Sequence, residues 1–375
     1  MGCMQHVRTG AERLAADPSL VPGSRIGLIT NPTGVLPDLT PTLDALLAAK
    51  VPVTALFGPE HGLRGTAQAG HGERTATDPR TGLPVYDTHQ VDGAELDAIV
   101  AASGVDTLVF DIADVGARFY TYVWTMYDLL RSAARLGLDF VVLDRPNPLG
   151  GEITEGPDLD PAFASFVGRH PIPLRHGRTA GELALLFDPG VRVVAMEGWR
   201  RDMDHAATGL PWVMPSVNMP TPDTALVYPG TGLFEGTNLS EGRGTTRPFE
   251  LVGAPYADER FARELNALDL PGVRFREVWF TPTFHKHAGT TVGGVQLHVH
   301  DRRAFRPVLT GLSMLHLARV LYPADFTWWG PESFMDHLWG SDTLTRRLDA
   351  GGDPRGLCPE PGVPSGHLLY TSSRR

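Results

Sequence analysis

Apolar segments that alternate with helical segments fill the first half of the chain, and this alternation restricts the fold more than any other feature of the sequence. Five segments are nearly continuous apolar runs with the length of a β-strand: 25–30, 51–57, 105–112, 139–143 and 191–196. Strands that are apolar throughout are typical of parallel sheets with both faces covered by helices. The alternation therefore predicts a Rossmann-like, doubly wound α/β domain.

Helical spacing of apolar residues lies between these strands, at 42–50, 122–136 and 179–187. The segment 210–255 differs, because it is dense in Pro, Gly and Thr and shows little periodicity. So long an irregular segment inside a folded protein is usually functional. A helix, a strand and a second helix are expected after it, at 258–268, 292–300 and 305–321. We therefore predict two domains, a Rossmann-like catalytic domain over 1–210 and a smaller C-terminal α+β auxiliary domain over 211–375.

The charge balance excludes some classes of partner. The chain has 33 Lys and Arg against 43 Asp and Glu, which gives a net charge of -10. Nucleic acids and anionic membranes attract clustered positive charge, so we expect neither as a partner. The two cysteines, Cys3 and Cys358, suggest neither a disulfide framework nor a metal site. Residues 1–20 show no signal peptide, which predicts a cytoplasmic protein, or a secreted one if a leader was removed. The sequence gives no oligomeric state.

Polar residues follow the expected strands at the points where the strands end. In an open parallel sheet, ligands bind beyond the carboxyl ends of the strands. Several acids are thus expected near one crevice, and crowded carboxylates raise one another's pKa, which keeps one of them protonated near neutral pH. The alternative is that each acid caps a helix or pairs with a nearby Arg. The candidates are Asn31, Glu60, His61, Asp111 and Asp114.

Glu60 has the most restricted setting of these residues. It lies in the sequence FGPEHG over 57–62, directly after a strand that is expected to be buried. Pro59 and the flanking glycines fix the turn, which suits a site that requires a rigidly held carboxyl group. The structural alternative is an acid that interacts with the dipole at the start of a helix.

Residues 114–122 combine an acid, a guanidinium group, phenols and a hydroxyl in one short stretch, with Asp114, Arg118 and Tyr120 among them. Binding sites for sugars use this mixture, because aromatic faces contact ring C–H groups while polar side chains bind hydroxyl groups. The alternative is the start of a helix with core aromatics and an exposed Arg.

The irregular segment holds a second cluster of polar residues over 235–247. Its glycines let the backbone approach a ligand closely. Arg243 and Arg247 suit an anionic substrate, and Asn238 and Glu241 add polar side chains. A phosphate-binding loop is an alternative, although the Gly-Lys-Ser/Thr sequence of such loops is missing. A solvated loop is the other alternative.

Other common motifs are missing from the sequence. Two pairs of histidines lie close together in the sequence, at 285 and 287 and at 298 and 300. Neither HExxH nor a Cys/His ligand pattern occurs. The turn over 31–34 is not GxGxxG, and no GxSxG elbow exists. We therefore expect no metal, no nicotinamide cofactor and no nucleophilic serine.

Several long segments together resemble one known family, the NamZ-type exo-β-N-acetylmuramidases. The resemblance spans most of the chain from about residue 20 to about residue 345, in segments rich in Gly, Pro and charge: 27–35, 55–65, 109–122, 142–151, 165–168, 176–177, 218–232 and 234–248. It implies a Rossmann-like domain and an auxiliary domain with the site in the cleft between them. It also implies hydrolysis of terminal N-acetylmuramic acid (MurNAc), β-1,4-linked to GlcNAc, from the non-reducing end of peptidoglycan fragments.

The resemblance also assigns a role to Glu60, which matches the catalytic glutamate of the family's FGPEHG segment. Glycoside hydrolysis usually requires a protonated carboxyl group and a second acid. We interpret Glu60 as the proton donor and keep Asp111, Asp114 and Glu241 as candidates for the second acid. The 2-acetamido group of the substrate is an alternative internal nucleophile.

A positive partner is expected for the lactyl carboxylate that distinguishes MurNAc from GlcNAc, because a guanidinium group binds a carboxylate at two points. The candidates are Arg118, Arg243 and Arg247. The remaining residues expected to bind substrate are Asn31, His61, Tyr120 and Asn238. Two other classes of function stay open, a non-catalytic muropeptide- or nucleotide-binding protein and a metal-dependent hydrolase.

Overall fold

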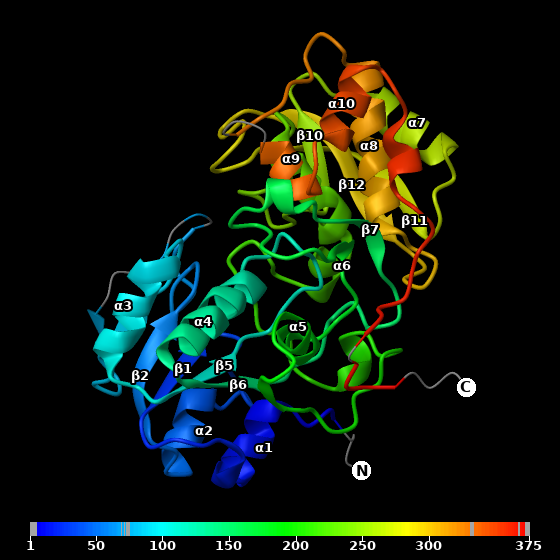
Figure 1. Ribbon diagram of the computed structural model, residues 1–375. Coiled ribbons are helices and arrows are strands. Elements are labelled where there is room, and N and C mark those ends of the chain that lie inside the picture. The colour runs from blue at the N-terminus through cyan, green and yellow to red at the C-terminus, as the bar shows by residue number, and fades with distance from the viewer. Residues whose placement is uncertain are drawn as a thin grey trace.

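A computed structural model of the protein describes residues 6–68, 70, 72, 76–330, 334–366 and 368–371. Cys3 lies outside the described residues, and Cys358 is a buried free thiol. The N-terminal half forms a Rossmann-like domain around a large sheet, and the auxiliary domain lies against one end of it (Figure 1). Within the described ranges, no helix has the length and apolar character required to cross a membrane.

The large sheet has seven strands in the order β3-β4-β2-β1-β5-β6-β9. All neighbouring strands are parallel except β3, which is antiparallel to β4. The order of the parallel strands reverses between β1 and β5, and such a switch point is where open α/β sheets bind ligands. The strands are β1 (Ile26–Thr30), β2 (Val53–Gly58), β3 (Ala76–Thr77), β4 (Pro84–Asp87), β5 (Thr107–Asp111), β6 (Asp139–Leu143) and β9 (Arg192–Val194).

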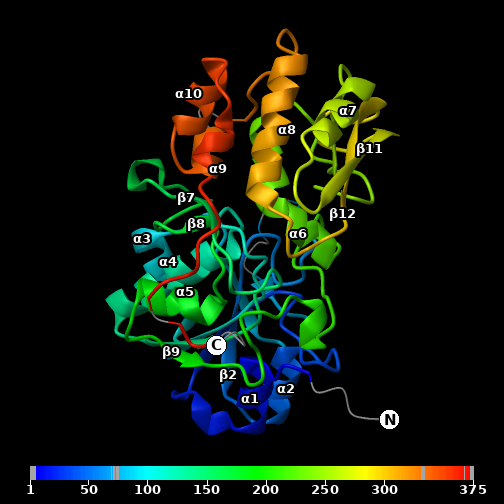
Figure 2. The ribbon, with the colours of Figure 1, turned by 90° about the vertical axis from the view of Figure 1, so that its right-hand side faces the viewer.

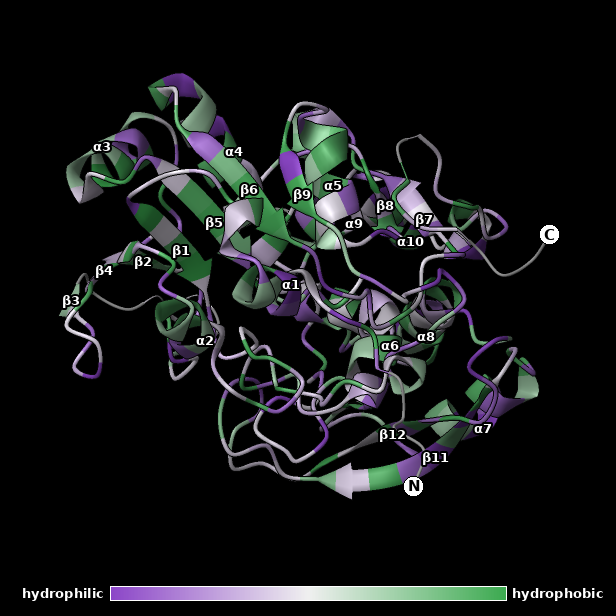
Figure 3. Ribbon diagram, turned by 90° about the horizontal axis from the view of Figure 1, so that it is seen from below, coloured by the Kyte–Doolittle hydropathy of each residue, from purple (hydrophilic) through white to green (hydrophobic). Residues whose placement is uncertain are grey.

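Helices cover both faces of this sheet, because successive side chains of a strand point to opposite faces. Phe110 of β5 packs in the same apolar cluster as residues of α3 (Gly93–Ser103), α4 (Tyr122–Leu136) and α5 (Ala180–Phe187). The neighbouring Val109 packs on the other face with α1 (Gly10–Ala16) and α2 (Thr42–Ala48). Figure 3 shows the central strands as strongly hydrophobic, as the uninterrupted apolar runs predicted.

Local signals in the sequence account for the ends of these helices. α4 coincides with the predicted range, and it ends at Gly137, whose φ of 68° is the left-handed conformation that glycine adopts readily. α5 begins after Thr179, whose side chain accepts a hydrogen bond from the backbone N–H of Glu182 in a capping box. Together, the strand order and the helices on both faces of the sheet confirm the predicted doubly wound α/β class.

The auxiliary domain is built on a three-stranded antiparallel sheet in the order β10-β12-β11. Its long helix α8 contacts both α6 and α7. The short strands β7 and β8 pair beside it, and β7 contacts α8. β7 (Glu155–Asp158) and β8 (Pro173–Arg175) belong to the N-terminal part of the chain. The auxiliary domain itself contains α6 (Pro222–Thr231), β10 (Leu251–Ala254), α7 (Glu259–Ala267), β11 (Val273–Phe280), β12 (Val292–Val299), α8 (Pro307–Leu321), α9 (Phe334–Trp339) and α10 (Thr343–Asp349).

The prediction of an irregular segment over 210–255 is wrong in part. The segment contains α6, the 3-10 helix η4 (Gly232–Gly236) and β10. α6 is capped by Thr221 and contains Pro229, and its residues from Thr224 onward are buried. A helix that is buried on all sides shows no amphipathic period, and its Pro and Gly residues conceal it further.

The C-terminal segment returns from the auxiliary domain to the Rossmann-like domain (Figure 2). Gly362 pairs with Thr154 through two backbone hydrogen bonds. The Tyr370 hydroxyl donates to Asp144 at 2.6 Å and accepts from the backbone N–H of Met196 at 2.8 Å. The tail thus ties the two domains together.

Candidate active site

A cleft of about 460 Å³ lies between the two domains. The Rossmann-like domain contributes the segments that follow β2 and β5, as expected for the carboxyl ends of parallel strands. The auxiliary domain contributes α6, η4 and the loops around residues 243, 284 and 329. The polar residues that line the cleft are Glu60, His61, Gln68, Tyr120, Thr121, Tyr122, Ser216, Asn218, Tyr228, Glu235, Arg243 and His285.

Glu60 lies in this cleft and is held at both carboxyl oxygens. Its Oε1 accepts a hydrogen bond from the backbone N–H of Gly70 at 2.6 Å, and its Oε2 accepts one from the Thr121 hydroxyl at 2.5 Å. The residue is only 7% exposed. β2 ends at Gly58, so the turn that follows brings the carboxyl group beside the start of α4. The sequence indicated a rigidly held carboxyl group here, and the structure places one in the cleft.

His61 follows in the left-handed conformation, with a φ of 70°. Its Nδ1 is 2.7 Å from the carbonyl oxygen of Ala67. A carbonyl oxygen only accepts, so Nδ1 carries the proton and Nε2 is left as an acceptor. Burial lowers the pKa of His61, which favours this neutral form near neutral pH. The ring also meets the edge of Tyr122, whose hydroxyl donates to the Pro215 carbonyl at 2.5 Å.

Two buried donors in the lining have no hydrogen-bond partner among the described residues. They are the hydroxyl of Tyr120 and the amide nitrogen of Asn218. Burial raises the pKa of the Tyr120 phenol, and the nearby Ser216 side chain opposes this rise. A buried donor without a partner costs about 1–3 kcal/mol. In a cleft, the oxygen atoms of a ligand can satisfy such donors.

The auxiliary domain contributes an acid that the sequence did not single out, Glu235 in η4. Its Oε1 is 3.2 Å from Nη2 of Arg243, and the side chain is 19% exposed. Arg243 also reaches Glu241, with its Nε 3.2 Å from Oε1 of that residue. Burial raises the pKa of Glu235, and the charge of Arg243 opposes this rise. Both Glu235 and Arg243 line the cleft.

Glu241 lies behind this pair and is not part of the lining. Its side chain is fully buried, with Oε2 2.9 Å from Nζ of Lys286 and Oε1 3.3 Å from Nδ1 of His285. Burial alone favours the protonated form, but Lys286 and its other positive neighbours hold the pKa of Glu241 well below the usual range. Glu235 and Glu241 are six residues apart in one polar segment, and nothing in their local sequence tells which of them faces the cleft.

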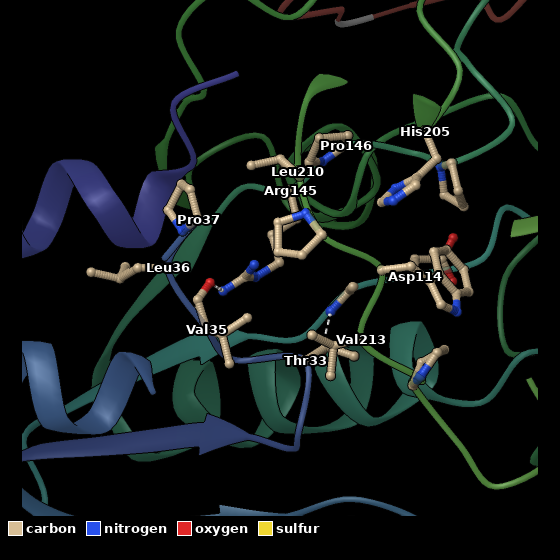
Figure 4. Close-up of a pocket in the computed structure, with 15 residues that line it drawn as sticks. Thr33, Val35, Leu36, Pro37, Asp114, Arg145, Pro146, His205, Leu210 and Val213 are labelled. Atoms are coloured by element: carbon tan, nitrogen blue, oxygen red, sulfur yellow. Dashed lines mark hydrogen bonds between the residues drawn. The ribbon is translucent and has the colours of Figure 1, made fainter. Parts of the chain in front are cut away.

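Asp111 and Asp114 lie at the switch point of the sheet but outside the lining of this cleft. Asp111 is fully buried in a two-point pair with Arg145, at 2.6 and 3.0 Å. Asp114 lines a separate small pocket of about 50 Å³ and is 3.0 Å from Nε2 of His176. Figure 4 shows Arg145 in that pocket, where its Nη2 donates to the Val35 carbonyl at 3.0 Å.

The three arginines predicted to bind substrate lie in different places, and one of them lines the cleft. Arg118 is fully buried and donates only to backbone carbonyl groups, those of Pro157, Ile172, Leu338 and Trp339. Burial lowers its pKa to about 10. Arg247 is half-exposed and pairs with Glu250 at 3.0 Å. Arg243 is thus the only Lys or Arg among the described lining residues.

Asn31 and Asn238 lie outside the lining and form hydrogen bonds with other protein groups. The side-chain oxygen of Asn31 accepts from the backbone N–H and the hydroxyl of Thr33, at 2.9 and 2.6 Å. That of Asn238 accepts from the Tyr256 hydroxyl at 2.7 Å and from the backbone N–H of Thr327 at 3.1 Å. Asn31 thus stabilises its own turn, and Asn238 joins its segment to residues 256 and 327.

Aromatic side chains line the outer part of the site. Phe166 and Phe334 are stacked with their ring centroids 6.4 Å apart and their planes 13° from parallel. Trp329 and Phe284 also line the cleft, and both are exposed. Such faces suit the C–H groups of sugar rings. In the part of the chain that the structure describes, no three His, Cys, Asp or Glu side chains come together as a metal site.

Comparisons with known proteins agree with this fold. The chain is 50% identical over 354 residues to the peptidoglycan beta-N-acetylmuramidase NamZ of Bacillus subtilis (strain 168), with 92% of this chain and 85% of the relative covered. It also resembles two crystal structures of DUF1343 family proteins from Bacteroides fragilis NCTC 9343. BF0371 is 35% identical with a TM-score of 0.85, and 94% of each chain is covered. BF0379 is 30% identical with a TM-score of 0.73, and 93% of this chain and 92% of that chain are covered.

Two family models match consecutive parts of the chain. The model of the N-terminal domain of exo-beta-N-acetylmuramidase NamZ matches residues 26–223, and the model of its C-terminal domain matches residues 226–358. The boundary between the two models falls within α6. Since the models and the curated relative together span nearly the whole chain, this protein belongs to the NamZ family of exo-beta-N-acetylmuramidases.

Proposed function

We propose that this protein is a glycoside hydrolase that releases N-acetylmuramic acid from the non-reducing end of peptidoglycan fragments such as MurNAc-β-1,4-GlcNAc. The observation that carries the proposal is one cleft, between the two domains of this family's fold, that holds the Glu60 carboxyl group and the Arg243 guanidinium group. The Glu60 carboxyl group can give the proton that the leaving sugar requires. The Arg243 guanidinium group can bind the lactyl carboxylate of MurNAc. A cleft of about 460 Å³ is within the usual range for small-molecule sites.

Glu60 is the proton donor in this proposal. As the bond between C1 of MurNAc and the glycosidic oxygen breaks, the oxygen takes the carboxyl proton and leaves as a hydroxyl group of GlcNAc. The Gly70 and Thr121 contacts hold the carboxyl group in one orientation before substrate binds. A donor that is already oriented loses little entropy when the reaction begins.

Synthetic MurNAc–GlcNAc and a chromogenic β-MurNAc glycoside test the proposed activity. We expect mass spectrometry to show free MurNAc and a fragment shortened by one sugar, without added nucleotide and in the presence of a metal chelator. Binding of the disaccharide without its cleavage would instead indicate a muropeptide-binding protein. Loss of activity in the chelator would indicate a metal-dependent hydrolase.

Arg243→Lys tests whether Arg243 binds the lactyl carboxylate of MurNAc. An ammonium group keeps the charge but loses the two-point geometry of guanidinium, so the preference for MurNAc over GlcNAc should fall by about 1–3 kcal/mol. The measurement is the ratio of kcat/KM for paired chromogenic β-MurNAc and β-GlcNAc glycosides.

Arg247→Lys is the matched control for this test, because Arg247 lies in the same segment but outside the cleft lining. The control should keep the wild-type ratio. If Arg243→Lys also keeps it, a different group binds the lactyl carboxylate, and the unpartnered donors of Tyr120 and Asn218 become the next candidates.

A further inference from the structure

We propose that Glu235 is the second catalytic carboxyl group and takes the proton of the water molecule that attacks C1. This inference rests on the function proposed above and adds a residue to it. Among the described residues that line the cleft, Glu60 and Glu235 are the only two that carry carboxyl groups. They come from different domains, Glu60 from the turn after β2 and Glu235 from η4 of the auxiliary domain. A sugar in the cleft therefore meets both.

Buried contacts fix the backbone that carries Glu235. Nζ of Lys286 donates to the carbonyl oxygens of Phe234, Glu235 and Leu239, at 2.8, 3.3 and 3.2 Å. Its contact with Glu241 neutralises both buried charges. The loop is thus closed around one ammonium group. In this arrangement, η4 presents the Glu235 side chain to the cleft.

A single ion pair holds the side chain itself. Oε1 of Glu235 contacts Arg243, while Oε2 accepts no hydrogen bond among the described residues. One oxygen is therefore fixed, and the other is left for water or substrate. Burial raises the pKa of Glu235, so its carboxylate is a stronger base than an ordinary glutamate, and Arg243 favours the ionised form that a base requires.

The two carboxyl groups share one neighbour in the cleft lining, the phenol of Tyr228. The charges of Arg243, Glu241 and Lys286, all in the auxiliary domain, also act on Glu235. Burial raises the pKa of Tyr228, and the charges of Glu235 and Glu60 raise it further. The Tyr228 phenol thus lies within range of both carboxyl groups. In this proposal a water molecule lies between Glu235 and C1 of the sugar, as in hydrolases that invert the anomeric centre.

The proposed reaction consumes one water molecule. The C1–O bond to GlcNAc breaks, and its oxygen takes the proton of Glu60. The water oxygen forms the new bond to C1 from the opposite face, and its released proton goes to Glu235. Exchange with solvent then returns Glu60 to its protonated form and Glu235 to its ionised form. β-linked MurNAc is released as the α-anomer.

Glu235→Gln tests the role with two substrates that differ in their leaving group. A dinitrophenyl β-MurNAc glycoside needs no proton donor, but it still needs an activated water. We expect kcat of Glu235→Gln to fall about 10²–10⁴-fold on both this substrate and MurNAc–GlcNAc. Glu60→Gln should lose activity on MurNAc–GlcNAc alone. Added azide needs no base, so it should restore turnover of the dinitrophenyl glycoside by Glu235→Gln and form the α-glycosyl azide.

Glu277→Gln is the matched control, because Glu277 is exposed on β11 of the same domain. It should keep wild-type rates, and the wild type itself must release MurNAc, which separates failure of this inference from failure of the proposed function. Proton NMR during wild-type hydrolysis should show α-MurNAc first. Initial release of the β-anomer, or a Glu235→Gln variant with near wild-type kcat or without azide rescue, would overturn the role of Glu235 as the base.

Discussion

Glu60→Gln should retain the fold and lose nearly all activity on MurNAc–GlcNAc. Glutamine has almost the same shape, and its carbonyl oxygen can still accept from the Gly70 N–H, while its amide can donate to the Thr121 oxygen. It has no acidic proton to give to the leaving oxygen. General acid catalysis commonly contributes about 10²–10⁴ in rate, so kcat should fall by that factor.

The measurement combines kcat/KM on the disaccharide with a thermal melt followed by circular dichroism. A melt close to that of the wild type shows that the loss is chemical. Recovery of Glu60→Gln on the dinitrophenyl glycoside would identify the missing step as proton donation. If the variant melts normally and stays within a factor of about three of wild-type activity, Glu60 is not the proton donor.

Lys286→Met should lower the free energy of unfolding by about 3–5 kcal/mol, the usual cost of removing one partner from a buried ion pair. Methionine fills a similar volume but leaves three carbonyl oxygens without their donor. Among the described residues, it also leaves Arg243 as the remaining cationic partner of Glu241, with the His285 ring beside it. Arg243 is then drawn between two acids, so the position of Glu235 is disturbed as well.

Urea unfolding of Lys286→Met against the wild type measures this change. The double variant Lys286→Met with Glu241→Gln removes the uncompensated charge, and we expect it to recover part of the lost stability. Lys50→Met is the control, because Lys50 is exposed at the end of α2. A loss below about 1 kcal/mol in the single variant would show that the contacts of Lys286 contribute little to folding.

The sequence by itself determined the Rossmann-like domain. Strand and helix periods are local, and the capping signals at Thr179 and Gly137 lie within the segments that they end. The turn that holds Glu60 was also readable, because Pro59 and the flanking glycines restrict the backbone without help from distant residues. The helix α6 was missed because a helix that is buried on all sides has no amphipathic period in its sequence.

Only the tertiary structure decided which polar side chains meet. Arg118 and Arg243 look alike in the sequence, but the first is satisfied by four backbone carbonyl groups, and the second lies in the cleft. Asp111 pairs with Arg145 from the neighbouring strand end, which no local pattern encodes. Glu235 faces the cleft and Glu241 turns away because Lys286, 45 residues beyond Glu241, closes the loop between them. Contacts between residues so far apart in the chain are decided by how the elements pack.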